Sequence, residues 1–337
     1  MKFGKINNYI LFGGGDLLLK IALFLKAQND EIFVVTADRH FSEKLKFISD
    51  GSFGEFLNEN SIKHIISKNV SVDSSVKKHI SENTIGLSFG AAWIFKKNFI
   101  DLFKGKLLNL HGSRLPLDRG GGGFSWRIMR GDKIGITLIH QILPGIDTGD
   151  IVDYESYVFP ENCRIPLDYY QIGIDKYYSF MNGFFDKVKK NEEFICTGQD
   201  EDLSTYWPRL NTDAHGYINW SNDVENIERF ICAFDDPYKG AITYINDDKV
   251  RVKKVFSTKA DGIFHPFQSG IIYRIMDGVV MVATNSGTLG INEIFNEKGE
   301  NIISILKVGD RLYTPREKIE KALQYRAIYT PDGLKKQ

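Results

Sequence analysis

Two polar side chains at the end of one apolar run carry the clearest chemical signal in the sequence. Asn109 and His111 belong to the run 106–112 (KLLNLHG), and residues two apart on a strand point to the same face. An amide can donate to a developing oxyanion, and an imidazole can accept a proton near neutral pH. The pair therefore predicts a catalytic site, with Asn109 as oxyanion donor and His111 as base.

Asp147 is the candidate partner of His111. It lies in the turn 143–150 (LPGIDTGD), which follows the apolar run 135–143. If the two strands are neighbours, a carboxylate in this turn holds the imidazole tautomer and favours its protonated form. Each residue alone is compatible with a structural role, since a histidine on a strand often packs and an aspartate often forms a turn. The combination favours catalysis.

Alternating short strands and helices must hold these side chains in place. We expect strands at 9–12, 31–35, 63–66, 84–89, 106–112 and 135–143, and helices at 16–26, 53–60, 72–82, 124–130 and 166–190. This alternation predicts an α/β fold with a Rossmann-like, mostly parallel sheet covered on both faces. Ligands of such sheets bind at the carboxyl ends of the strands, where Asn109 and His111 would lie.

The pattern changes near residue 200. After a polar stretch and a helix expected at 223–234, short strands at 241–245, 250–256, 270–275 and 279–284 are separated by turn residues. This pattern predicts a smaller β-rich domain, an OB-like antiparallel barrel, followed by a helix at 317–327. We therefore predict a catalytic domain over 1–200 and a linker helix plus barrel over 201–337.

Composition excludes several classes of protein. The 337 residues are 42% hydrophobic and 26% charged, which is ordinary for globular proteins and too apolar for a disordered chain. No apolar stretch is long enough to span a membrane. The three cysteines, Cys163, Cys196 and Cys232, are odd in number and form no CxxC pair, and the histidines lack metal-ligand spacing. We expect a soluble cytoplasmic protein without a disulfide framework or a metal site.

The glycine run Gly13–Gly15 half-matches a dinucleotide-binding fingerprint. Gly13 and Gly15 fit G-x-G-x-x-G, but Leu18 occupies the third position. Asp38 follows the second expected strand, where a ribose-binding acid would lie. Two interpretations stay open: an NAD-type or non-catalytic nucleotide-binding site, and a tight first turn with no dinucleotide, which the missing third glycine favours.

Three motifs together resemble the folate-dependent formyltransferases. They are Asn109-Leu-His111, the loop 113–120 (SRLPLDRG), and the turn 147–150 (DTGD), whose aspartate follows His111 by 147 minus 111, or 36, residues. Downstream, the stretches 206–209 (YWPR), 218–220 (INW) and 227–240 are similar to the family's linker and to the first helix after its catalytic domain. The loop departs from the family pattern at Gly120–Gly123, which lacks a proline and should be more mobile.

The resemblance implies a reaction and its residues. An acceptor amine attacks the formyl carbon of N10-formyltetrahydrofolate, which serves as co-substrate without a metal. Asn109 would stabilise the tetrahedral oxyanion, His111 would relay the amine proton, and Asp147 would orient His111. Folate contacts are implied at Trp93, Ile94, Leu143 and Gly145.

Charge discriminates among the family's acceptors. Residues 201–337 hold 18 basic and 19 acidic residues, whereas tRNA-specific members carry a basic C-terminal domain that grips phosphates. The glycinamide ribonucleotide enzymes are much shorter. The resemblance therefore favours a dTDP- or UDP-linked amino sugar, used for surface polysaccharide, with a methionyl-tRNA formyltransferase as the alternative. We expect a homodimer without nucleic-acid or membrane partners.

Substrate contacts are expected at polar and aromatic residues near these motifs. The guanidinium groups of arginines bind phosphate oxygens well, and aromatic rings can stack on a base. The candidates for the diphosphate are Arg114, Arg119, Arg127 and Arg209, and those for the base are Tyr206 and Trp207.

Overall fold

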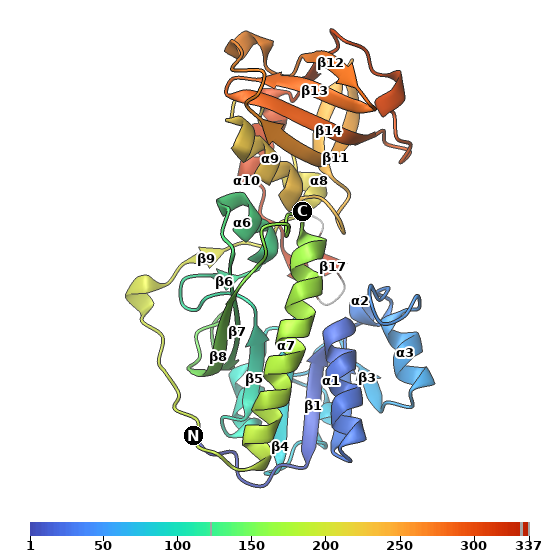
Figure 1. Cartoon of the computed structure of the whole chain (residues 1–337). Coiled ribbons are helices and arrows are strands. Elements are labelled where there is room, and N and C mark those ends of the chain that lie inside the picture. Colours follow the sequence, from blue (N-terminus) through green and yellow to red (C-terminus); the bar gives the residue numbers. More distant parts are fainter. Residues whose placement is uncertain (122, 331–332, 336–337) are drawn as a thin grey trace.

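The computed structural model describes residues 1–121, 123–330 and 333–335, and it arranges them in two lobes (Figure 1). The larger lobe is built on a seven-stranded sheet with the order β3-β2-β1-β4-β5-β7-β8. The parallel strands are β1 (Asn8–Gly13), β2 (Glu31–Thr36), β3 (His64–Ile66), β4 (Thr84–Phe89) and β5 (Leu107–His111). The antiparallel strands are β7 (Ile134–Gln141) and β8 (Ile151–Val158).

Alternate side chains of β1 explain why both faces of this sheet are covered. Tyr9 and Leu11 join the core beneath α1 (Asp16–Ala27) and α7 (Pro166–Lys189), which lie side by side on one face (Figure 1). Ile10 and Phe12 point to the opposite face and pack with Phe99 of α5 (Lys97–Ile100). A strand buried on both faces is typical of parallel sheets between helices. The predicted Rossmann-like fold is confirmed.

The helix predicted over 72–82 is wrong in length. Only α4 (Ser74–Lys77) is helical, with Asp73 accepting the Ser75 N–H at its start. Ser81 then bonds to Thr84 through main-chain and hydroxyl groups. Serine side chains compete for main-chain groups and weaken helices. The other helices before α6 are α2 (Asp38–Phe41), α3 (Phe53–Glu59) and the 3-10 turn η1 (Asp101–Phe103).

The smaller lobe is an antiparallel sheet with the order β12-β13-β14-β11-β10-β15 (Figure 1). Its strands are β10 (Ala241–Ile245), β11 (Asp248–Thr258), β12 (Ile272–Met276), β13 (Val279–Thr284), β14 (Gly287–Phe295) and β15 (Leu312–Tyr313). Main-chain hydrogen bonds from 270–272 to 309–312 bring the two edge strands together, so the sheet curls into the small barrel predicted. The helices of this part are α8 (Thr212–His215), α9 (Val224–Ala233) and α10 (Arg316–Gln324).

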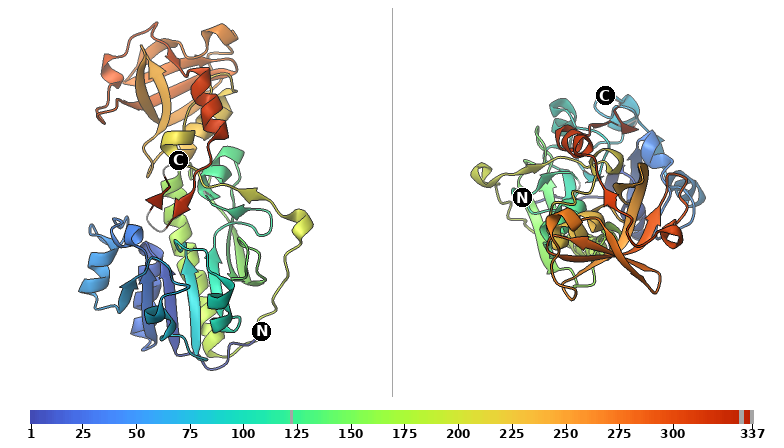
Figure 2. Two further views of the ribbon diagram at one scale, coloured as in Figure 1. Left: turned by 180° about the vertical axis from the view of Figure 1, so that it is seen from behind. Right: turned by 90° about the horizontal axis from the view of Figure 1, so that it is seen from above.

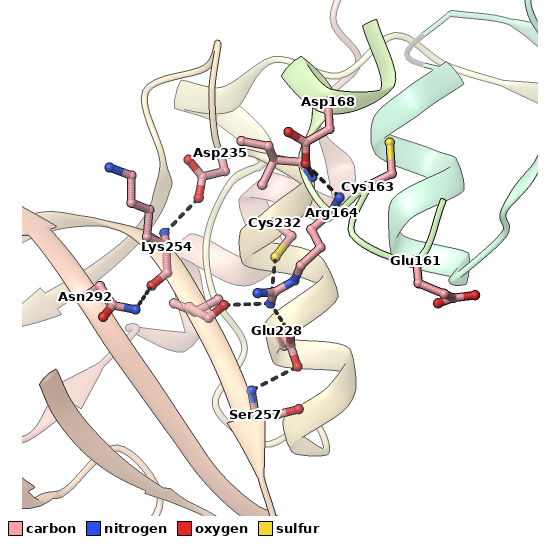
Figure 3. Close-up of polar contacts among 12 residues, drawn as sticks. Glu161, Cys163, Arg164, Asp168, Glu228, Cys232, Asp235, Lys254, Ser257 and Asn292 are labelled. Carbon is pink, nitrogen blue, oxygen red and sulfur yellow. Dashed lines mark hydrogen bonds and ion pairs between the residues drawn. The ribbon is translucent and has the colours of Figure 1, made fainter. Parts of the chain in front are cut away.

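Helix α9 joins the two lobes. It packs against α6 (Gly123–Arg130) of the larger lobe and against β11 of the smaller one. Arg164, which lies just before α7, pairs with Glu228 of α9 (Figure 3). Its Nη2 also donates to the main-chain oxygen of Val255 at 2.7 Å. Glu228 also accepts the Ser257 N–H at 3.0 Å. The Glu228 carboxylate on α9 therefore contacts both Arg164 of the larger lobe and β11 of the smaller lobe.

An extended linker runs back along the larger lobe after α7, as the rear view in Figure 2 shows. It carries the 3-10 turn η2 (Glu201–Leu203) and the short strand β9 (Tyr206–Trp207), which pairs in parallel with β6 (Arg119–Gly120). The predicted division at residue 200 therefore falls within a segment that still contacts the first lobe. The remaining short elements are β16 (Tyr329–Thr330), β17 (Gly333–Leu334), η3 (Pro266–Gln268) and η4 (Ile303–Ile305). Within the described residues, no helix combines the length and apolarity needed to cross a bilayer.

Candidate active site

A cavity of about 240 Å³ lies at the carboxyl ends of β4 and β5. It is lined by the three predicted catalytic residues, by the four predicted folate contacts and by one predicted substrate arginine: Asn109, His111, Asp147, Trp93, Ile94, Leu143, Gly145 and Arg209. These residues come from four separate stretches of the chain. The strand-end location is the one expected for ligands of an open α/β sheet.

The register of β5 places Asn109 and His111 at this cavity. Asn109 lies opposite Ser88 of β4 and His140 of β7. Leu108, which points to the other face, is fully buried, while Asn109 and His111 are only half-buried. The alternation of the strand therefore directs the apolar residue into the core and the two polar ones toward the cavity.

His140 also lines the cavity, and the sequence analysis did not select it. Its Nε2 lies 3.1 Å from Asn109 Nδ2, and its Nδ1 lies 2.8 Å from the main-chain oxygen of Gln141. Nδ1 therefore carries the proton, and Nε2 accepts from the Asn109 amide. His140 is 2% exposed, and burial, together with the neighbouring His111, lowers its pKa to about 4. A neutral His140 thus orients the Asn109 amide.

Asp147 is held in place by main-chain groups. Its Oδ2 accepts the Gly120 N–H at 3.0 Å, and its own carbonyl accepts from Gln199 Nε2 at 2.8 Å. Asp147 has φ = 55°, a left-handed conformation that aspartate tolerates better than most residues. The turn therefore depends on both the glycine-rich loop and the linker.

Asp147, which we expected to orient the His111 imidazole, makes no hydrogen bond to His111 among the described residues. Asp147 Oδ1 instead lies 3.7 Å from His140 Nε2, and His111 Nε2 lies 3.5 Å from the main-chain oxygen of Asp118. Ligating atoms of His111, His140 and Asp147 all lie within 4.8 Å of one another. The carboxylate is therefore an electrostatic neighbour of both imidazoles. The Asn109 amide already occupies the Nε2 lone pair of His140 that a metal ion would need.

The four predicted phosphate-binding arginines lie in three different environments. Arg114 pairs with Asp118 and Asp132, and Arg119 donates to Gln199 and Glu201. Arg127 is 1% exposed, which excludes it as a direct phosphate ligand and corrects that expectation. Arg209 lines the cavity, and its guanidinium lies 5.1 Å above the Tyr329 ring. Of the four, Arg209 alone both faces the cavity and makes no ion pair with a described carboxylate.

The two residues predicted to stack on the base, Tyr206 and Trp207, lie beside the glycine-rich loop and do not line the cavity. Trp207 packs 5.5 Å from the Trp126 ring, and Tyr206 is half-exposed. A Cβ on Gly120, which has φ = 99°, would meet the Trp207 carbonyl oxygen at 2.3 Å. Glycine at this position is therefore required by the close approach of β9. Gly122, part of the predicted mobile loop, lies outside the described residues.

The N-terminal glycine run has a packing explanation. A Cβ on Gly13, at φ = 129°, would lie 2.2 Å from the Phe89 carbonyl oxygen. The turn after β1 therefore presses against the end of β4, next to the cavity. Close packing of two strand ends accounts for glycine at the first position without a dinucleotide.

Comparison with known families decides the assignment. Residues 9–162 match the family described as "Formyl transferase", and residues 211–306 match "Formyl transferase, C-terminal domain". The chain belongs to the formyl transferase family. Both lobes of this formyltransferase therefore have counterparts in the family, and Asn109, His111 and Asp147 lie within the first matched segment.

Individual relatives are similar at low identity. Methionyl-tRNA formyltransferase of Ruminiclostridium cellulolyticum is 27% identical over 243 residues, which cover 68% of this chain and 75% of that protein. The solved structure of WlaRD, "a sugar 3N-formyl transferase in the presence of dTdp and 5-N-Formyl-THF", has a TM-score of 0.63 at 20% identity and covers 85% of this chain and 97% of that one. A Helicobacter canadensis enzyme with folinic acid and dTDP-3-aminofucose gives the same TM-score and identity, covering 85% and 98%. At this identity the structural likeness shows a shared fold.

Proposed function

We propose that this formyltransferase moves a formyl group from N10-formyltetrahydrofolate to the amine of a dTDP- or UDP-linked amino sugar. One observation supports the proposal: a single cavity is lined by the three predicted catalytic residues, by the four predicted folate contacts and by Arg209, which makes no ion pair with a described carboxylate. Of the solved relatives named above, WlaRD was determined with 5-N-Formyl-THF and dTDP, and the Helicobacter canadensis enzyme with folinic acid and dTDP-3-aminofucose. Their shared fold supports the same two ligand classes here.

The geometry supports direct transfer between two amines. The acceptor nitrogen attacks the formyl carbon and forms a tetrahedral oxyanion, toward which Asn109 donates an N–H. His140 keeps the Asn109 amide turned so that its nitrogen stays on the cavity side. His111 accepts the proton that the acceptor amine loses and returns it to N10 as the N10–carbon bond breaks. The negative charge of Asp147 stabilises the imidazolium that forms between these steps.

The two ligands can be assigned to different parts of the cavity. Trp93 and Ile94 follow β4, and Leu143 and Gly145 precede the Asp147 turn, so these four residues frame one side for the pterin. Arg209 comes from the linker and offers its guanidinium to the diphosphate of the acceptor. Arg114 and Arg119 already pair with carboxylates, and we propose that they shape the substrate loop.

A tRNA acceptor is the second candidate, because a methionyl-tRNA formyltransferase is among the relatives. The balanced charge of residues 201–337 argues against it, since tRNA binding draws on a surplus of Lys and Arg. We therefore rank the nucleotide-linked amino sugar first.

The test is formyl transfer to defined acceptors. The purified chain is incubated with N10-formyltetrahydrofolate and a panel of dTDP- and UDP-linked amino sugars, in parallel with methionyl initiator tRNA, and N-formyl products are read by mass spectrometry. We expect transfer to at least one sugar and none to tRNA. Arg209→Ala should raise the KM for the sugar about tenfold and leave the KM for the folate unchanged. Formylation of the tRNA alone would overturn the proposal. Gel filtration of the same sample tests the expected homodimer.

A further inference from the structure

Arg127 is a buried cation that forms no ion pair with the carboxylates of the described residues. It is the largest fully buried side chain of the described residues, at 1% exposure. Its Nε and Nη1 find no hydrogen-bond acceptor there, and it forms no ion pair with a described carboxylate. Removing a charge from water without pairing it is costly. A residue kept at that cost needs a role that an apolar side chain could not fill.

Aromatic side chains surround the guanidinium. Its Cζ lies 5.6 Å from the centre of the Phe159 ring, a cation–π distance. Tyr157, Tyr169 and Tyr177 are close enough for the Arg127 charge to favour their ionised forms, although burial dominates and raises the pKa of all three. The three phenols therefore stay neutral beside the cation.

Among the described residues, the side-chain hydrogen bond of Arg127 goes to the main chain just after β5. Its Nη2 donates to the main-chain oxygen of Gly112 at 3.2 Å, and Gly112 directly follows His111. The same glycine is confined on its other side, because a Cβ there would lie 2.2 Å from the Tyr177 hydroxyl. The main chain after His111 thus contacts both the buried Arg127 guanidinium and the half-buried side chain of Tyr177.

A second hydrogen bond, between Gly120 and Asp147, lies at the other end of the glycine-rich loop. The loop begins at Gly120, whose N–H donates to Asp147 Oδ2, and it leads into α6, which carries Arg127. One end of the loop therefore holds the catalytic carboxylate, and the helix after it holds the strand end of His111.

We propose that Arg127 is a positioning residue that fixes the His111 imidazole through the Gly112 carbonyl, and so couples the position of α6 and its loop to the base. The inference rests on the proposed function and deepens it. A shift of about 1 Å in a catalytic group can lower turnover about 10²-fold, so Arg127→Met should lower kcat between 10- and 100-fold. The KM for N10-formyltetrahydrofolate should change less than threefold, because Arg127 does not line the cavity.

A double-mutant cycle separates positioning from general stability. If Arg127 acts through His111, Arg127→Met lowers kcat strongly in the wild-type background and hardly at all in a His111→Asn background. Arg164→Met is the control: it removes an exposed, ion-paired arginine at the lobe junction and should leave kcat unchanged while lowering the Tm. Equal losses of kcat in both backgrounds, or a wild-type kcat in Arg127→Met, would overturn the proposal.

Two further measurements keep the proposal testable if Arg127→Met does not fold. Arg127→Lys keeps the cation but lacks the planar fork, so its kcat should also fall. Histidine side-chain ¹H–¹⁵N spectra, assigned with His111→Asn, should show a changed His111 signal in Arg127→Lys and an unchanged one in Arg164→Met. This readout needs no acceptor, so it stands even if the wild-type chain formylates none of the sugars. An unchanged His111 signal would refute the role.

Discussion

Replacing His140 with glutamine should flatten the pH dependence of stability. The folded-state pKa of His140 is about 4, against an ordinary value of 6.5, because the ring is buried and lies near His111. Between pH 6.5 and pH 4 the unfolded chain binds a proton at this histidine and the folded chain does not. The contribution of neutral His140 to the free energy of unfolding is therefore present in full above pH 6.5 and is lost as the pH falls toward 4. Glutamine accepts the same hydrogen bond from Asn109 but does not titrate.

The magnitude follows from the two pKa values. Integrating proton linkage from pH 7 to pH 5, with 6.5 for the unfolded chain and about 4 for the folded one, gives a loss of about 2 kcal/mol in the free energy of unfolding from this residue. His40, whose pKa is also lowered to about 4, contributes in the same direction but is present in both proteins. Comparing wild type with His140→Gln therefore isolates the contribution of His140.

Urea unfolding at pH 7 and pH 5, followed by tryptophan fluorescence, measures the difference. The wild type should lose about 2 kcal/mol more than His140→Gln over this interval. Turnover at pH 7 offers a second readout: His140→Gln should stay within about tenfold of wild type, while His140→Leu, which removes the acceptor that orients Asn109, should fall about 10²-fold. Parallel stability profiles for wild type and His140→Gln would refute the neutral, buried state assigned to His140.

Three further substitutions test other parts of the site. Asp147→Asn should lower kcat about 10²-fold with a nearly unchanged Tm, because the amide removes the negative charge beside His111. A normal kcat for this variant in steady-state kinetics at pH 7 would exclude an electrostatic role for Asp147. Trp93→Ala should raise the KM for N10-formyltetrahydrofolate roughly tenfold with little change in the KM for the sugar, because the ring proposed to cover the pterin is lost. Equal effects on both KM values would contradict a folate contact at Trp93. Gly120→Ala should destabilise the fold by about 1–3 kcal/mol in urea unfolding, because φ is positive and the added Cβ would strike the Trp207 carbonyl; a neutral result would contradict the β6–β9 packing.

Periodicity and motif spacing predicted the fold and most of the cavity. Strand alternation places Asn109 and His111 on one face, and the Asp147 turn follows the neighbouring strand, so both features are local and readable. His140 was missed because its role depends on register: it lies directly opposite Asn109 only once β5 and β7 are paired. Its one visible signal was a single imidazole in the apolar run 135–143.

Charge pairing across long sequence separations was the part that could not be predicted. Arg119 looks like a phosphate ligand in the loop, yet Glu201, 82 residues away, occupies its guanidinium. Arg127 looks like a surface cation, yet the aromatic cluster around Phe159 buries it. Nothing in the local sequence distinguishes these arginines from Arg209. Only the tertiary arrangement decides which of them remains free for a ligand.

The linker has a consequence for chimeric enzymes. Gln199 donates one amide proton to the carbonyl of Asp147 and the other to that of Gly149, and Arg119 rests on Glu201. A graft that exchanged the C-terminal lobe at residue 200 would keep every catalytic side chain but replace Glu201 and β9. Module exchange in this scaffold must therefore carry residues 199–207 with the catalytic half. Proteolytic cleavage within residues 199–207 should therefore lower activity even though Asn109, His111 and Asp147 stay intact, because that segment supports the Asp147 turn.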